Sequence, residues 1–180
     1  MTAMRTIIRA ATKKEDEPYN IIMLLDDEQS LSYISNLCET QNKFYFWESI
    51  NGVDWNDSVC MKPENCMKLQ GQAMPEHIDF DIVLCLNRGF FQLCKNIASF
   101  WHIPIILFES QIPNEQFKQS NPQDWFAAKS CEGDINVFIS DETRDRWEQM
   151  GYVIGQNSES FCDSWNNVFQ EACSLVYTRI

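Results

Sequence analysis

Short apolar runs alternate with amphipathic stretches along most of the chain. Several of these runs have the continuous apolar character of strands that are buried on both faces, as in a parallel sheet. We predict strands at residues 21–25, 44–47, 82–86, 105–108 and 136–139. Weaker candidates lie at residues 66–69 and 152–155. The alternation with helical stretches predicts βαβ units and a mainly parallel sheet.

Helical periodicity fills the intervals between these runs. Apolar residues recur at helical spacing in residues 31–38 and 90–101, and short helical turns are expected within residues 114–134. The most regular amphipathic helix is the last segment, residues 160–177. Its apolar positions are Phe161, Trp165, Val168, Phe169, Ala172, Leu175 and Val176. With right-handed crossovers, these units predict an α/β fold: a three-layer Rossmann-like sandwich with a C-terminal amphipathic helix.

One helix has sequence signals at both ends. Ser140 stands at an N-cap position, where its hydroxyl can accept a hydrogen bond from the N–H groups of the first turn. Asp141 follows it, and a carboxylate there favours the positive end of the helix dipole. Gly151 is predicted as the C′ residue that closes this helix.

The length of 180 residues suits one domain, predicted to span residues 1–180 with residues 1–18 as an N-terminal extension. No apolar run reaches the roughly 18 residues that a membrane helix needs, so we expect no membrane partner. The start of the chain lacks an apolar stretch and a small-residue cleavage site, so no secretion signal is predicted.

The numbers and spacing of cysteines and histidines indicate whether a metal site is present and whether the protein resides in a reducing compartment. The eight cysteines form no CxxC pair and only two histidines are present, which argues against a metal site. Several cysteines fall on apolar strand or helix patterns, as small buried hydrophobes do in a reducing compartment. We therefore predict a cytoplasmic protein without structural disulfides.

The formal net charge of −12 narrows the range of partners. Such a surface repels a phosphate backbone, so we expect no nucleic-acid partner. Two interpretations of the charge stay open: a solubilising surface, or a surface that recognises a basic protein.

In open α/β sheets, ligands bind at the carboxyl ends of the strands. This rule converts the predicted strands into a predicted site, because the residues just past them gather along one edge. The candidate ligand-binding residues are Asp26, Asp27, Asn87, Arg88, Gly89, Ser110, Ser140 and Asp141. Glu109 is the candidate catalytic residue, since a carboxylate partly buried in a cleft can serve as a general base.

Each candidate also has a structural interpretation. Asp26 and Asp27 can start the first helix, and Asn87 can cap the next one with Gly89 in a tight turn. Arg88 can pair with a neighbouring carboxylate and do nothing else.

Nucleotide-binding motifs are missing from the sequence. The turn after the first strand reads LLDDEQS, without the GxGxxG pattern, and its carboxylates would repel a pyrophosphate. Neither a phosphate-binding GxxxxGK[ST] loop nor a GxSxG nucleophile elbow occurs. We therefore predict no cofactor.

Two phrases carry a family resemblance: DFDIVLCLNRGFFQLCKNIASFWHIPIILFES, and then GDINVFISDETRDRWEQMGYVIG. Their order resembles the N-terminal, acceptor-side domain of two-domain (GT-B type) glycosyltransferases, particularly those encoded by viruses and bacteria. The resemblance covers roughly residues 19–155. It rests on strand and helix phrases rather than on a catalytic signature.

The resemblance implies a function, but this sequence departs from the family pattern in two respects. In that family a second Rossmann domain binds the nucleotide-sugar, and the chain then returns in a helix that packs on the first domain. Residues 160–177 look like this return helix, and no donor domain precedes them. The strand-end Glu-His phrase of the family reads Glu109-Ser110 here, so a histidine near the reaction is missing. The implied protein is a reduced relative, inactive alone or completed by a donor-domain subunit, with a sugar-bearing acceptor.

Two alternatives stay open. One is an acidic interaction or antagonist protein that uses the same scaffold without catalysis; if it is viral, its location is the host cytoplasm. The other is a Rossmann-type small-molecule binder, whose ligand would be cationic or neutral near Asp26 and Asp27.

Overall fold

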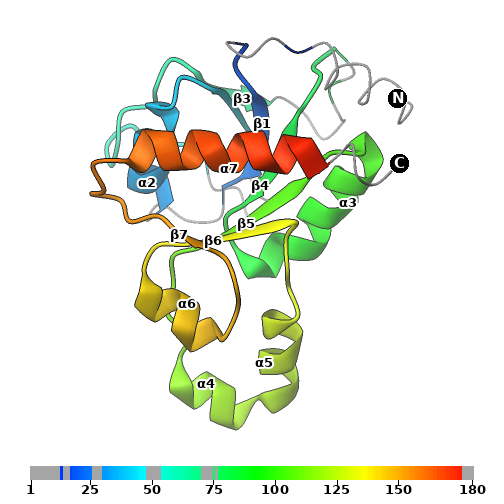
Figure 1. The fold of residues 1–180 in the computed structure, drawn as a ribbon, viewed down its shortest axis with the longest axis vertical. Helices are drawn as coiled ribbons and strands as arrows, with labels where there is room; N and C mark the ends of the chain where they lie inside the picture. Colours follow the sequence, from blue (N-terminus) through cyan, green and yellow to red (C-terminus); the bar gives the residue numbers. More distant parts are fainter. Residues whose placement is uncertain are drawn as a thin grey trace.

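The predicted strands lie in one parallel sheet (Figure 1). The computed structural model describes residues 13, 17–25, 30–47, 54–69, 75 and 77–175. Within these residues the sheet has seven strands in the order β3-β2-β1-β4-β5-β6-β7, and every neighbouring pair is parallel. The strands are β1 Asn20–Leu24, β2 Lys43–Trp47, β3 Cys66–Leu69, β4 Ile82–Cys85, β5 Ile105–Glu109, β6 Ile135–Phe138 and β7 Tyr152–Val153. The predicted α/β class and parallel sheet are confirmed.

Helices connect these strands and cover both faces of the sheet. They are α2 Ser30–Cys38, η1 Arg88–Phe90, α3 Phe91–Trp101, α4 Glu115–Ser120, α5 Pro122–Lys129, α6 Asp141–Trp147 and α7 Phe161–Leu175. None of those in the described ranges combines the length and the apolar character needed to cross a bilayer. Strand order reverses between β1 and β4, and this is the point where ligands of open α/β sheets bind.

Two apolar layers follow from the alternation of side chains along each strand. In β4, Ile82 and Leu84 join the core under α2 and α7, whereas Val83 and Cys85 join the core under α3. Both sets are buried, which explains why the strands have continuous apolar sequences. The result is the predicted three-layer sandwich.

Helix α7 is part of the first core layer. It leaves the β7 edge of the sheet and runs back across the strands beside α2 (Figure 1). Trp165 is fully buried, and its Nε1 donates to the Tyr33 hydroxyl at 3.0 Å. That hydroxyl donates in turn to the Ile154 carbonyl at 3.2 Å. The predicted C-terminal amphipathic helix is confirmed over residues 161–175; residues 176 and 177 lie outside the described residues.

The amino end of the sheet is fixed by a buried ion pair. Asp81, just before β4, accepts hydrogen bonds from the Asn20 N–H and from Lys13 Nζ, both at 2.8 Å. Lys13 belongs to the predicted N-terminal extension, most of which lies outside the described residues.

One prediction about helix ends is wrong. Helix α6 does not run to Gly151; it ends at Trp147, and Glu148 takes the left-handed conformation with a φ of 52°. Gly151 is required for a different reason: a Cβ there would lie 2.4 Å from the Asn136 carbonyl oxygen. The glycine lets the chain approach β6 before it enters β7.

Candidate functional site

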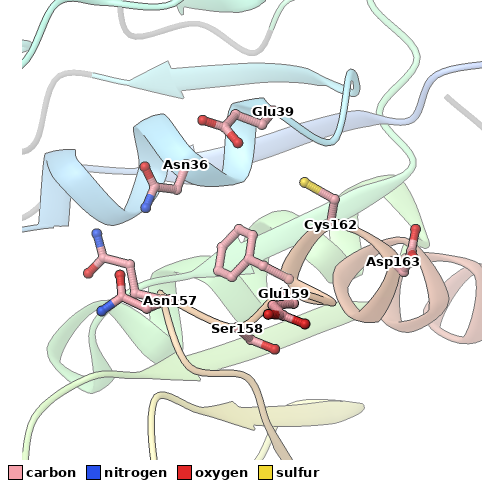
Figure 2. Close-up of a pocket in the computed structure, with 9 residues that line it drawn as sticks. Asn36, Glu39, Asn157, Ser158, Glu159, Cys162 and Asp163 are labelled. Carbon is pink, nitrogen blue, oxygen red and sulfur yellow. The ribbon is translucent and has the colours of Figure 1, made fainter.

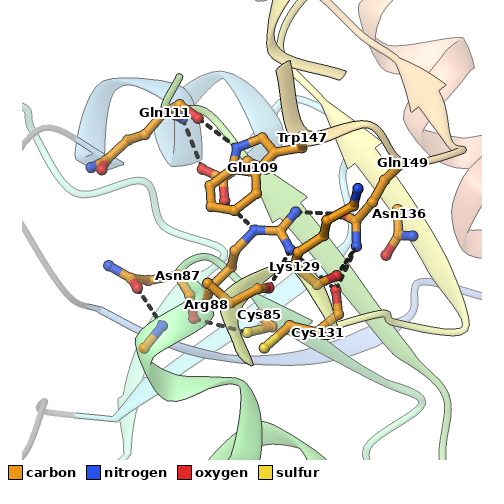
Figure 3. Close-up of polar contacts among 12 residues, drawn as sticks. Cys85, Asn87, Arg88, Glu109, Gln111, Lys129, Cys131, Asn136, Trp147 and Gln149 are labelled. Atoms are coloured by element: carbon orange, nitrogen blue, oxygen red, sulfur yellow. Dashed lines mark hydrogen bonds and ion pairs between the residues drawn. The ribbon is translucent and has the colours of Figure 1, made fainter. Parts of the chain in front are cut away.

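Arg88 is the centre of a network of polar contacts near the carboxyl end of β4 (Figure 3). It is the first residue of η1, which follows β4 after two intervening residues, and its side chain is only 6% exposed. Its Nε donates to Glu109 Oε2 at 2.7 Å, and its Nη2 donates to Gln149 Oε1 at 2.6 Å. Its Nη1 donates to the carbonyls of Ala128 and Cys131, at 2.9 and 3.1 Å.

Aromatic and amide groups complete this cluster. The guanidinium lies over the Trp147 ring, 3.8 Å from its centroid, a distance at which cation–π attraction is strong. Trp147 Nε1 donates to the Gln111 carbonyl at 2.8 Å. Gln149 Nε2 donates to the carbonyl of Lys129 at 2.6 Å. We call the set Arg88, Glu109, Trp147 and Gln149 the Arg88 hub.

Glu109 uses both carboxylate oxygens within the protein. Oε2 accepts from Arg88, and Oε1 accepts from the Gln111 N–H at 2.8 Å. Burial raises the pKa of Glu109 above its ordinary value, while the Gln111 N–H and the Arg88 charge oppose that shift. A general base needs a free lone pair that faces its substrate. The contacts of Glu109 are structural, and its catalytic role stays a prediction.

The turn after β4 adopts the conformation that its structural interpretation implies. Asn87 Oδ1 accepts from the Gly89 N–H at 2.6 Å and so caps η1. The Asn87 carbonyl accepts from Cys85 Sγ at 3.2 Å. Arg88 pairs with a carboxylate, as that interpretation also states.

The remaining candidates differ in accessibility. Ser140 caps α6, with its Oγ accepting from the Thr143 N–H at 3.1 Å. Ser110 is exposed, and so is Asp141, whose carboxylate pairs with Arg144 at 2.9 Å. Asp26 and Asp27 lie outside the described residues. Ligand binding by this edge stays a prediction for all of these residues.

Trp147 and Gln149 are hub residues that the sequence did not single out. They lie at the end of α6 and just beyond it, about 60 positions after Arg88 in the chain. Other partners of Arg88 are backbone carbonyls, which carry no residue-type signal. A sequence signal exists only for the Arg88–Glu109 pair, because both residues lie just past predicted strands.

A second feature is an open hollow between α2 and the start of α7 (Figure 2). Its volume is about 500 Å³. The lining consists of Asn36, Glu39, Gln156, Asn157, Ser158, Glu159, Phe161, Cys162 and Asp163. Three of these are carboxylates and none is basic, so the hollow carries a negative potential. Burial, with Glu39 and Asp163 nearby, raises the pKa of the Cys162 thiol.

The structure also shows whether side chains that could bind a metal ion lie together and whether the cysteines form disulfides. In the part of the chain that the structure describes, no group of three or more His, Cys, Asp or Glu residues is placed to hold a metal ion. All eight cysteines are free thiols, and four of them are buried: Cys38, Cys66, Cys85 and Cys94.

No family model matches the chain, and neither a curated protein nor a solved structure matches it.

Proposed function

We propose that this chain is a glycosyltransferase-like domain that corresponds to an acceptor-binding half and does not transfer sugar by itself. The observation that supports the proposal is the path of α7, which returns from the β7 edge across a parallel Rossmann-like sheet and packs beside α2. The family resemblance implies a return helix in this position.

The state of the carboxyl edge supports the inactive form of this proposal. Glu109, the candidate base, is held by Arg88 and by the Gln111 N–H. Transfer also requires a donor oriented beside the acceptor, which supplies much of the barrier reduction. The described residues form one sheet, so on this proposal the donor site is supplied from outside them.

Calorimetric titration with UDP-, GDP- and CDP-linked sugars tests the proposal. We expect no saturable binding by the chain alone, and no release of nucleotide. Tight binding of a sugar nucleotide would overturn the proposal, because it would require a donor site within these residues.

Acceptor binding is tested separately with a glycan array. The exposed Ser110 and Asp141 lie at the predicted edge, so Ser110→Ala with Asp141→Asn should weaken any glycan that binds the wild type. The matched control is Ser174→Ala with Asp163→Asn, two exposed positions on α7. If both double variants bound the glycan equally well, the acceptor site would not lie at this edge.

A second candidate is an acidic interaction protein, favoured by the hollow between α2 and α7. Its carboxylates, Glu39, Glu159 and Asp163, lie in a lining without a basic residue. Such a surface attracts a basic partner, and salt weakens the attraction.

Affinity capture from a cell lysate at low and high salt separates the two candidates. On the interaction proposal, a stoichiometric protein partner is lost at high salt and in a variant with Glu39→Gln, Glu159→Gln and Asp163→Asn. The control neutralises exposed carboxylates elsewhere, at Glu64, Asp124 and Glu132. Equal loss in both variants would show that net charge, rather than the hollow, recruits the partner.

A further inference from the structure

Residues 113–130 connect β5 to β6 and extend away from the sheet (Figure 1). We call them the arm; they contain α4 and α5. Among its side chains that the structure describes, only Trp125 is buried, and the neighbouring Phe126 is 70% exposed. The arm therefore contributes little to the two core layers of the sheet, and its attachment depends on a small number of contacts.

The main apolar contact is one aromatic stack. Trp125 lies on Trp147 of α6 with ring centroids 5.1 Å apart and an interplanar angle of 16°. Phe138 closes this small cluster from β6. The cluster is separate from the layers under α2, α7 and α3.

The main polar contact is the Arg88 hub. The last turn of a helix leaves carbonyls without intrahelical partners, and their partial negative charge attracts cations. Arg88 Nη1 donates to the Ala128 and Cys131 carbonyls, and Gln149 Nε2 donates to the Lys129 carbonyl. The end of α5 is thus held by side chains from the body of the protein.

Surface ion pairs add a weaker ring of contacts. Glu148 accepts from Lys118 and Lys129, and Arg146 pairs with Glu115 at 2.9 Å. Exposed pairs of this kind contribute little to stability. The arm is therefore held chiefly by Trp125 and by the Arg88 hub.

We propose that the arm is a hinged lid that opens as one unit while the sheet stays folded, by releasing Trp125 from Trp147, the Ala128 carbonyl from Arg88 and the Lys129 carbonyl from Gln149. Segments with few buried apolar contacts open at lower free energy than a core does. Opening exposes the Trp147 ring and the Nη1 donors of Arg88, at the edge where ligands of this fold bind. The proposal goes beyond the proposed function and does not depend on it.

Hydrogen exchange measured by mass spectrometry on the full chain tests the lid. Arg88→Lys keeps the charge but loses the planar guanidinium, whose three nitrogens bind Glu109, Gln149 and the Ala128 carbonyl at once. We expect exchange in peptides from residues 113–130 to rise at least about tenfold, since a single hydrogen bond to a charged group is worth roughly that factor. Peptides from β1 and β4 exchange through global unfolding, so their slower rates should rise by about the same factor and stay below those of the arm.

The control variant is Asp81→Asn, which breaks the buried ion pair between Asp81 and Lys13 at the amino end of the sheet. It should leave exchange in the arm unchanged. Asp81→Asn should raise exchange in β1 and β4. An unchanged arm in Arg88→Lys, or a rise in the arm equal to that of the strands in Asp81→Asn, would overturn the proposal.

A second measurement uses the wild type, in case Arg88→Lys does not fold. In low concentrations of urea, the amides of Trp125 and Ser130 should exchange through an opening with weaker urea dependence than that of the strand amides. If the exchange rates of arm and strand amides had the same urea dependence, the lid proposal would be overturned as well.

Discussion

Arg88 and Glu109 are opposite charges with almost no access to water: their side chains are 6% and 8% exposed. Removing two charges from water costs several kcal/mol per ion, and their attraction offsets this only when further hydrogen bonds satisfy both groups. Arg88 meets that condition through Gln149 and two carbonyls, and Glu109 meets it through the Gln111 N–H. Removal of one partner should therefore cost more than the pair itself contributes.

Arg88→Met should lower the free energy of unfolding by about 3–5 kcal/mol, because it leaves Glu109 charged and buried without its partner. Arg88→Met combined with Glu109→Gln should cost less than the sum of the two single changes, by roughly 0.5–3 kcal/mol. Urea denaturation of the wild type and three variants gives this coupling.

The matched control for this cycle is Arg146→Met. Its ion pair with Glu115 is half exposed on both sides, so its loss should cost less than about 1 kcal/mol. Additive costs at Arg88 and Glu109 would mean that the two residues do not act as a pair.

The sequence supports this residue-scale picture only in part. Arg88, Glu109, Asn87 and Ser140 were placed at the carboxyl edge because each lies within two residues of the end of a predicted strand. The partners of Arg88 could not be predicted, since hydrogen bonds to the Ala128 and Cys131 carbonyls depend on how the chain folds back rather than on residue type.

At the scale of elements, the edge strand β7 depends on a close approach to β6. It has only two residues, and it is preceded by Gly151, which faces the Asn136 carbonyl. The sequence analysis singled out Gly151 as the end of a helix. A glycine is required there, but because of its close packing against β6. Glu148 already provides the left-handed residue that ends α6.

Gly151→Ala should destabilise the protein by about 1–3 kcal/mol, the usual range for forcing an extra methyl into a packed site. The reason is that a Cβ would lie 2.4 Å from the Asn136 oxygen, closer than real Cβ atoms approach. Thermal and urea melts measure the loss.

Gly155→Ala is the matched control, because its Cβ would meet the Ile139 oxygen at an ordinary 3.7 Å. It should leave stability unchanged or raise it by up to about 1 kcal/mol through the unfolded state. If the two variants melted alike, the close approach of Gly151 would not matter for the fold.

Helix α7 provides a second prediction at this scale. Trp165→Ala should cost about 3–5 kcal/mol, the usual range for removing a large buried aromatic. Trp165 is fully buried against Phe108 and Phe169, and it donates to Tyr33. The comparison is Phe126→Ala in the arm. Its ring is 70% exposed, so this variant should change the free energy of unfolding by less than about 0.5 kcal/mol. A loss below about 1 kcal/mol for Trp165→Ala would make α7 peripheral and would favour the interaction proposal.

At the scale of the whole molecule, the sheet joins two core layers that cannot meet directly. Its strands were predictable because a parallel strand buried on both faces is a continuous apolar run, as in Ile82–Cys85. The order of the strands was not predicted, since the apolar character of a strand does not indicate which strands it pairs with. Whether the two layers form one cooperative domain, as predicted for residues 1–180, depends on how they unfold.

The buried cysteines report on that cooperativity. Cys38 and Cys66 lie in the layer under α2 and α7, and Cys85 and Cys94 lie in the layer under α3. A hydrogen bond with Cys66, together with burial, raises the pKa of Cys38 far above its ordinary value. A hydrogen bond with Cys85, together with burial, does the same for Cys94. Since the thiolate is the reactive form, neither thiol should react at pH 8 while it stays buried.

We therefore expect iodoacetamide at pH 8 to label these four buried cysteines only through unfolding, and all at one common rate. Mass spectrometry of labelled peptides measures each rate, with the half-buried Cys60 as an internal control that labels without unfolding. Urea should accelerate the buried four together and leave Cys60 nearly unchanged. If Cys38 and Cys66 labelled at one rate and Cys85 and Cys94 at another, the layers would unfold separately. The central sheet would then fail to couple them, and the prediction of one domain would be wrong.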